Sequence, residues 1–180
     1  MRDALIVSTA RTPLTKSYRG TFNNTTAPTM AGWAIEEAVK RSGVDPNKVD
    51  DVIMGAALQQ GTQHCNVARN AALAAGLPVT VSGMTLDRQC SSGMMAIATA
   101  AKQIISDGMD VVVGGGLDSI SLVQTEKMNL DRWVDKKLIA QHKHIYMPML
   151  KTAEVVANRY NISRESQDEY SLQSQLRTAK

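Results

Sequence analysis

The chain has 180 residues, 43% hydrophobic and 21% charged, a balance typical of a soluble globular protein that can bury a sizeable core. Its net charge of +3 and aromatic content of 4% argue against nucleic-acid binding, because both a strong basic field and base-stacking side chains are lacking. Two cysteines are too few for a disulfide framework, and no apolar run reaches the roughly 20 residues of a membrane helix. We expect a cytoplasmic protein, with an organelle matrix as the alternative.

Strand and helix signals alternate over the first 118 residues. A short apolar run at residues 4–8 reads as a strand rather than a secretory signal, and apolar spacing predicts a helix over residues 30–41 that ends at Gly43. The further expected strands are 52–56, 79–86 and 109–113, and the further expected helices are 67–75 and 92–106. Such alternation predicts a parallel or mixed sheet with crossover helices.

The character of the chain changes after Gly116. Residues 119–151 lose clear periodicity, and two helices are then expected at 151–160 and from Ser163 to about residue 180. Ser163 is a suitable N-cap, because a serine oxygen can accept a hydrogen bond from the first turn of a helix. We therefore predict two domains, residues 1–118 and residues 119–180.

Cys90 is the candidate nucleophile of this chain. It stands where an expected strand gives way to a helix, and a helix start offers unpaired N–H groups and a positive dipole end that stabilise a thiolate. No charged residue occurs from Cys90 to Ala101, so the helix behind the thiol is expected to be buried. The alternative is a structural cysteine, since free cysteine is among the most buried residue types.

The sequence around Cys90 resembles the nucleophile motif of the thiolases, the acyl-CoA C-acyltransferases. That run is Asp87-Arg88-Gln89-Cys90-Ser91-Ser92-Gly93. Segments 10–13, 115–121, 152–154 and 162–168 also resemble thiolase segments in order and spacing, so the resemblance extends over nearly the whole chain. Asp87 departs from the family pattern, in which asparagine is common. A carboxylate facing the thiol would oppose thiolate formation, whereas one turned onto the backbone would cap the turn.

The resemblance implies a layered α/β thiolase fold. The chain would hold most of the first βαβαβαββ unit, with a mixed sheet, and part of an inserted, mainly helical loop domain that cradles coenzyme A. Cys90 would take the acyl group from a 3-oxoacyl-CoA as a thioester, release acetyl-CoA, and pass the acyl group to coenzyme A. Coenzyme A is then a substrate, no metal or permanently bound cofactor is implied, and the complete protein is expected to be a homodimer or homotetramer. Pro148-Met149 resembles the degradative type, which acts in β-oxidation of fatty acids.

The family's proton-transfer groups are absent from this sequence. They are a histidine in a Gly-His-Pro motif and a second cysteine in a Cys-x-Gly motif, and the 180 residues contain neither. A thiol nucleophile needs such partners within reach, so we expect the isolated chain to be inactive. The alternative hypothesis is a non-catalytic fragment, or a subunit that needs a partner half.

Other motifs carry weaker hypotheses. Gly114-Gly115-Gly116 loosely fits a dinucleotide-binding turn, but no convincing helix follows it, so a glycine turn leaving a strand is favoured. The spacing of the three histidines and Cys65 fits no standard zinc pattern; these are His64, Cys65, His142 and His144. An unrelated cysteine enzyme is disfavoured, because the chain has no Cys-x-x-Cys pair.

Overall fold

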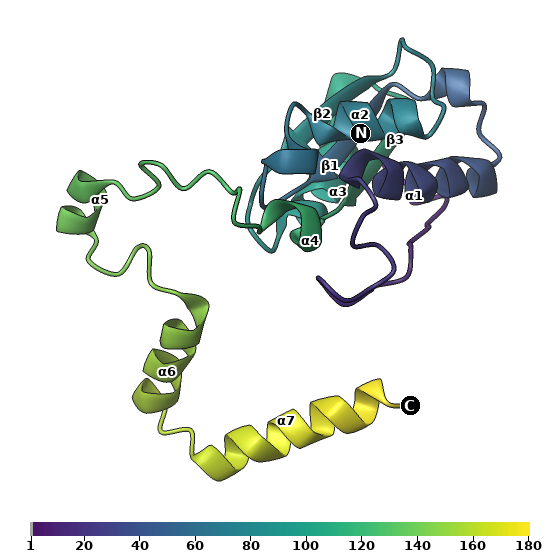
Figure 1. Cartoon of the computed structure of the whole chain (residues 1–180). Helices are drawn as coiled ribbons and strands as arrows, with labels where there is room; N and C mark the ends of the chain where they lie inside the picture. The colour runs from purple at the N-terminus through teal and green to yellow at the C-terminus, as the bar shows by residue number, and fades with distance from the viewer. Residues whose placement is uncertain (1) are drawn as a thin grey trace. The chain divides into compact units, whose positions relative to one another are not determined.

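The computed structural model describes residues 2–180 in two compact units. One unit ends at Asn129, and the other comprises Leu130–Lys180 (Figure 1). The first unit is built on a three-stranded parallel sheet in the order β2-β1-β3. Its strands are β1 (Asp51–Gly55), β2 (Ser82–Leu86) and β3 (Val112–Gly116). Three of the four strands expected in this unit, those at 52–56, 79–86 and 109–113, are thus formed, with shifts of up to three residues at their ends.

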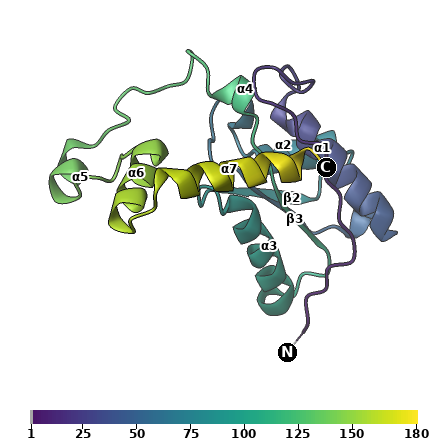
Figure 2. The same ribbon diagram turned by 90° about the horizontal axis from the view of Figure 1, so that it is seen from below.

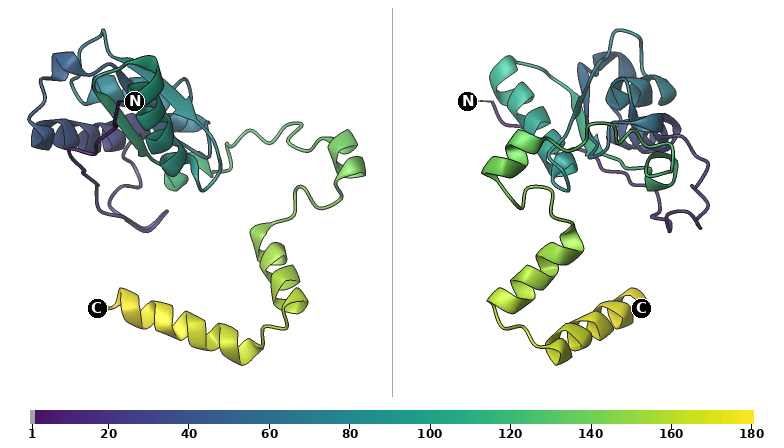
Figure 3. Two further views of the ribbon diagram at one scale, coloured as in Figure 1. Left: turned by 180° about the vertical axis from the view of Figure 1, so that it is seen from behind. Right: turned by 60° about the vertical axis from the view of Figure 1, so that its left-hand side comes forward.

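The helices cover the two faces of this sheet. In the first unit they are α1 (Ala27–Ser42), α2 (Val67–Ala74), α3 (Ser92–Lys102) and α4 (Ile120–Val123), with short turns η1 (Pro46–Lys48), η2 (Gly61–Gln63) and the π-helical η3 (Gln103–Asp107). Figure 2 shows α1 and α2 on one face and α3 on the other. The left panel of Figure 3 shows α3 in front of the sheet.

Strand β1 is buried because it lies between β2 and β3 and helices pack on both faces of the sheet. Val52 and Met54 belong to the cluster that includes α1 and α2, whereas Ile53 packs with Ala96 and Ala100 of α3. Side chains of a strand alternate between its two faces, so one apolar run serves two cores. This explains why residues 52–56 read as a continuous apolar segment.

The strand expected at residues 4–8 is not formed. These residues have no regular structure, and Leu5, Ile6 and Val7 are 77%, 78% and 69% exposed. An apolar run becomes a strand only when a neighbouring strand takes up its backbone hydrogen bonds, and this segment pairs with none of the strands among residues 2–180. The prediction of a first strand at this position is therefore wrong for the structure described.

Helix α3 is buried along one face only. Ala96 and Ala100 are buried against the sheet, but Met94 and Ile97 are 76% and 47% exposed. The sequence predicts a buried helix, whereas the structure buries only the face that the sheet covers. The helix continues into η3 and ends at Gly108, whose φ of 79° lies in the left-handed region that favours glycine.

The second unit is helical. It contains α5 (Lys136–Gln141), α6 (Met149–Arg159) and α7 (Arg164–Thr178). The predicted N-cap of α7 is confirmed, since Ser163 Oγ accepts a hydrogen bond from the Ser166 N–H at 3.3 Å. Among residues 2–180, none of the helices combines the length and the apolar character that crossing a bilayer requires.

Candidate active site

The carboxyl ends of the three strands meet at one edge of the sheet. Gly55 pairs in register with Leu86 on one side and with Gly116 on the other. Hydrogen bonds continue past the strands, from the Ala56 N–H to the Leu86 carbonyl and from the Leu117 N–H to the Gly55 carbonyl, both at 3.0 Å. Ligands of open α/β sheets bind at this edge, so we expect a site in the loops that leave it.

Cys90 lies in the loop that leaves β2. It directly precedes Ser91, the N-cap residue of α3, and its side chain is exposed. A core structural role, which needs burial, is not what the structure shows. The thiol instead stands before the amino end of a helix, on the side of the positive end of the helix dipole.

The turn around Cys90 is held by backbone and side-chain hydrogen bonds. Gln89 has a φ of 51°, in the left-handed region, and its carbonyl accepts the Ser92 N–H at 3.0 Å. Asp87 Oδ1 accepts the Gln89 N–H at 2.7 Å. Ser92 Oγ accepts the Arg88 N–H at 2.8 Å and donates to the Gln89 carbonyl at 2.6 Å. Asp87 precedes Cys90 in the sequence and Ser92 follows it. Of the two orientations considered for the Asp87 carboxylate, the structure shows the one that is turned onto the backbone and caps the turn.

Glycines bring the start of α3 against the ends of the strands. A Cβ atom at Gly55 would lie 2.1 Å from the carbonyl carbon of Ser92, and one at Gly116 would lie 2.9 Å from Cα of Gly93. Real Cβ atoms do not approach other atoms so closely, so any side chain at Gly55 would displace the turn. The position of Cys90 therefore depends on a glycine 35 residues earlier in the sequence.

A polar network around the buried Gln63 side chain lies near the same edge. Gln63 is 1% exposed, and its Nε2 donates to the Leu58 carbonyl at 2.7 Å and to Asp118 Oδ1 at 3.0 Å. Its Oε1 accepts the Ser119 N–H. The sequence offered no sign of this role, because Gln63 lies in a polar loop and becomes significant only through its burial.

Burial raises the pKa of the Asp118 carboxyl. Hydrogen bonds from the Gln63 side chain and from the backbone N–H groups of Ala57 and Leu58 act in the opposite direction, and the negative charge of Asp87 adds to the rise. The charge of Asp87, which caps the Cys90 turn, therefore acts on the Asp118 carboxyl.

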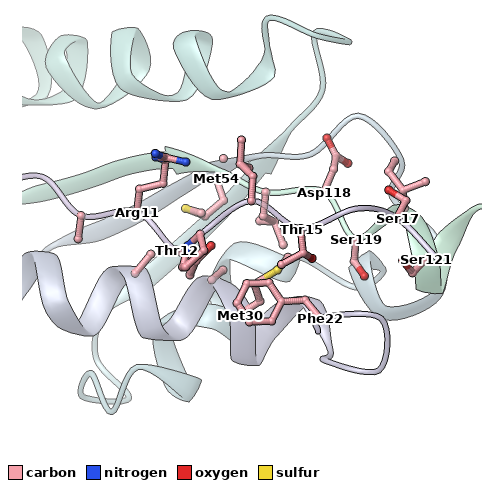
Figure 4. Close-up of a pocket in the computed structure, with 18 residues that line it drawn as sticks. Arg11, Thr12, Thr15, Ser17, Phe22, Met30, Met54, Asp118, Ser119 and Ser121 are labelled. Atoms are coloured by element: carbon pink, nitrogen blue, oxygen red, sulfur yellow. The ribbon is translucent and has the colours of Figure 1, made fainter. Parts of the chain in front are cut away.

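A cavity of about 270 Å³ lies at the side of the sheet that α1 covers. Figure 4 shows Arg11 and Asp118 on one side of it and Met30 and Phe22 on the other. Met54 and Gly116, near the ends of β1 and β3, also line it. Cys90 is not among its lining residues. This cavity is therefore separate from the turn that carries Cys90, residues 87–92, which we call the nucleophile turn.

The residues considered as zinc ligands are distributed over both units. His64 Nδ1 lies 2.6 Å from Cys65 Sγ in the first unit, whereas His142 and His144 belong to the second. Among residues 2–180, no three His, Cys, Asp or Glu side chains form a group suited to a metal ion.

Comparison with known proteins gives consistent matches. A family model described as the N-terminal domain of thiolase matches residues 4–180. A 3-ketoacyl-CoA thiolase of Bacillus subtilis is 37% identical over 180 residues, which are 100% of this chain and 46% of the relative. An acetyl-CoA acetyltransferase of Cupriavidus necator is 37% identical over 185 residues, covering 97% of this chain and 47% of the relative.

A solved structure has the same fold. The crystal structure of the Bacillus anthracis acetyl-CoA acetyltransferase matches with a TM-score of 0.80 and 39% identity, over 96% of this chain and 45% of that chain. The present chain therefore spans less than half the length of the relatives it matches.

Proposed function

This chain belongs to the thiolase family, and we propose that Cys90 carries the acyl group in a thiolase reaction. The family and the thiolase-like α/β fold predicted from the sequence motifs are both confirmed by the matches over the full chain. The supporting observation for the role of Cys90 is its placement: an exposed thiol directly before the N-cap of α3, at the carboxyl edge of a parallel sheet.

The proposed chemistry has two steps. In the first, the Cys90 thiolate attacks the 3-keto carbon of a 3-oxoacyl-CoA, the bond between C2 and C3 breaks, and the acetyl-CoA carbanion takes up a proton and leaves. In the second, coenzyme A gives up its thiol proton, attacks the Cys90 thioester and departs as acyl-CoA, which restores the thiolate. Dividing one carbon–carbon cleavage in this way gives two easier reactions. The reverse sequence joins two acyl-CoA molecules.

Both steps move protons, and the resemblance assigns that work to motifs that the 180 residues do not contain. We infer that a Gly-His-Pro histidine and a Cys-x-Gly cysteine must come from residues outside these 180. Coenzyme A and acyl-CoA are the proposed substrates, and a homodimer or homotetramer is the proposed assembly of the complete protein. Pro148-Met149 resembles the degradative type, and the proposed reaction is reversible.

Complementation tests this proposal. The 180-residue chain is mixed, or co-expressed, with the polypeptide that forms the remaining part of the Bacillus subtilis relative, and thiolysis of acetoacetyl-CoA is followed by the loss of its enolate absorbance. We expect no turnover from the chain alone and measurable turnover from the pair. Cys90→Ser should abolish that turnover, while Cys65→Ser, the matched change of the other thiol, should retain it.

Two outcomes of this experiment would count against the proposal. If a pair that demonstrably associates gives no turnover, the alternative of a non-catalytic fragment or subunit is favoured. If the chain alone turns over at a rate comparable to a complete thiolase, the assignment of the proton-transfer groups is wrong.

A further inference from the structure

We propose that Asp87 is a positioning residue for Cys90: together with Ser92 it locks the left-handed turn that places the thiol before α3. The inference rests on the proposed function for its effect on turnover, but the reactivity of the thiol tests it independently of any thiolase activity. Neither the family match nor the relatives' names assign a role to this residue, at which the chain departs from the asparagine common in the family.

The first step of the argument is the backbone conformation at Gln89. A non-glycine residue with φ near 50° is uncommon and persists only when its surroundings hold it. Here the Gln89 N–H is held at 2.7 Å by Asp87 Oδ1, and the Gln89 carbonyl accepts the Ser92 hydroxyl at 2.6 Å. Both backbone polar groups of the strained residue Gln89 are therefore fixed by side chains on either side of Cys90.

The second step is that Asp87 has no evident role in the core. Its side chain is exposed, so its removal takes away no apolar packing, whereas Ser92 is 4% exposed and is anchored between the Arg88 N–H and the Gln89 carbonyl. Ser92 Oγ also approaches Asp87 Oδ1 to 3.5 Å. The structural effect of Asp87 is thus confined to the turn that carries the nucleophile.

The third step separates geometry from charge. The hydrogen bond to Gln89 needs an acceptor oxygen bonded to the γ carbon, which asparagine also supplies, whereas glutamate places its carboxylate one methylene further away. Asp87→Asn keeps the geometry and removes the charge. Asp87→Glu keeps the charge and removes the geometry. The charge of Asp87 also acts at this edge of the sheet, since it contributes to the raised pKa of Asp118.

The chain also contains a matched control. Asp45 makes the same kind of turn at the start of η1, with its Oδ1 accepting the Asn47 N–H at 2.9 Å, and it lies 20 or more positions from either cysteine in the sequence. Asp45→Ala removes an equivalent capping bond without touching the nucleophile turn. Cys65, the second exposed thiol, serves as an internal reference in every variant.

The experiment is site-resolved alkylation of the full chain with iodoacetamide at neutral pH, with labelling of Cys90 and Cys65 quantified by peptide mass spectrometry. We expect the Cys90-to-Cys65 rate ratio to fall by about threefold or more in Asp87→Ala and Asp87→Glu, the size of effect that loss of one hydrogen bond can produce. The ratio should be retained or raised in Asp87→Asn and unchanged in Asp45→Ala. Amide exchange should show protection of the Gln89 N–H lost in Asp87→Glu and kept in Asp87→Asn.

Two results would overturn the proposal. A ratio that rises in Asp87→Ala as much as in Asp87→Asn would mean that Asp87 acts through its charge alone. A ratio that falls equally in Asp87→Asn and Asp87→Glu would mean that the hydrogen-bond geometry is not what matters. If Asp87→Ala does not fold, the Asn and Glu pair decides the question. Failure of thiolase turnover in the complementation experiment would leave these outcomes unaffected, so the two proposals fail separately.

Discussion

Gly55 of β1 lies directly against the backbone of Ser92, so closely that a Cβ atom at Gly55 would come within 2.1 Å of the Ser92 carbonyl carbon. The other near atoms are also backbone, the Ser92 oxygen at 2.4 Å and the Gly93 nitrogen at 2.5 Å, and neither can swing aside as the end of a side chain could. This contact sets how far the nucleophile turn can settle onto the edge of the sheet.

Substitution of this glycine should therefore be costly. We expect Gly55→Ala to lower the free energy of unfolding by about 1–3 kcal/mol, the range for forced overpacking of a core, as measured by urea denaturation. Gly93→Ala is the matched control, because its Cβ would lie 3.7 Å from Cα of Gly116, an ordinary contact, and alanine favours a helix. Equal stability of Gly55→Ala and the parent would contradict the close contact.

The two serines at the start of α3 should differ in their effect on stability. Ser92→Ala removes the acceptor of the Arg88 N–H and the donor to the Gln89 carbonyl at a buried position, so we expect a loss of about 1–3 kcal/mol in the free energy of unfolding. Ser91 is the N-cap by position, but its side chain makes no capping hydrogen bond. Ser91→Ala should stay within about 0.5 kcal/mol of the parent. The reverse order in thermal or urea melts would show that the hydrogen bonds are misassigned.

Removal of Gln63 should loosen the loops at the carboxyl edge. The side chain is buried and bonds to the Leu58 carbonyl, the Asp118 carboxyl and the Ser119 N–H. Gln63→Ala leaves these groups without their partner, and we expect a loss of about 2 kcal/mol or more in the free energy of unfolding. Gln59 is exposed in the same loop, so Gln59→Ala provides the control. Similar melting curves for the two variants would count against the buried network.

Asp118 should give stability a characteristic dependence on pH. Burial raises its pKa above the ordinary value of 3.8, so the folded state holds the proton more tightly than the unfolded state. The resulting stabilisation is complete below pH 3.8 and is lost as the pH rises through the folded-state pKa. The stability of the parent relative to Asp118→Asn should therefore fall over that window, as followed by urea unfolding at a series of pH values.

A second carboxyl supplies the opposite sign. The hydrogen bonds from the Asn47 backbone and side chain lower the pKa of Asp45, so its contribution is present above pH 3.8 and is lost as the pH falls. The parent should thus gain stability relative to Asp45→Asn as the pH rises. A relative stability of Asp118→Asn that did not change with pH would show that the folded protein does not raise the pKa of this carboxyl.

The elements that the sequence predicted best are those in which local pattern and tertiary environment agree. Residues 52–56 are apolar at every position because β1 is covered on both faces, and Ser163 caps α7 through a bond within its own turn. Residues 4–8 have the same local pattern as a buried strand, yet Leu5 and Val7 are exposed. A run of side chains cannot indicate whether another strand will pair with it.

The candidate site also contains one part that local sequence predicts and another that it does not. Cys90 was found from its position before a helix and from the motif around it. The supporting contacts join residues far apart in the chain, such as Gln63 with Asp118, which are separated by 55 positions. The approach of Gly55 to Ser92 is equally remote in sequence. Such contacts depend on how strands and helices pack, and no local spacing predicts them.

The central claim is that the sulfur of Cys90 carries the acyl group, and the most direct measurement is to locate that group. The chain, paired with the remaining part of the Bacillus subtilis relative, is incubated with isotopically labelled acetyl-CoA, quenched in acid, digested and analysed by mass spectrometry. We predict labelled acetyl on the peptide that contains Cys90, its loss when coenzyme A is added before the quench, and no label in Cys90→Ser. Label on Cys65 or on any residue outside the Cys90 peptide, in a pair that shows thiolysis, would contradict the account.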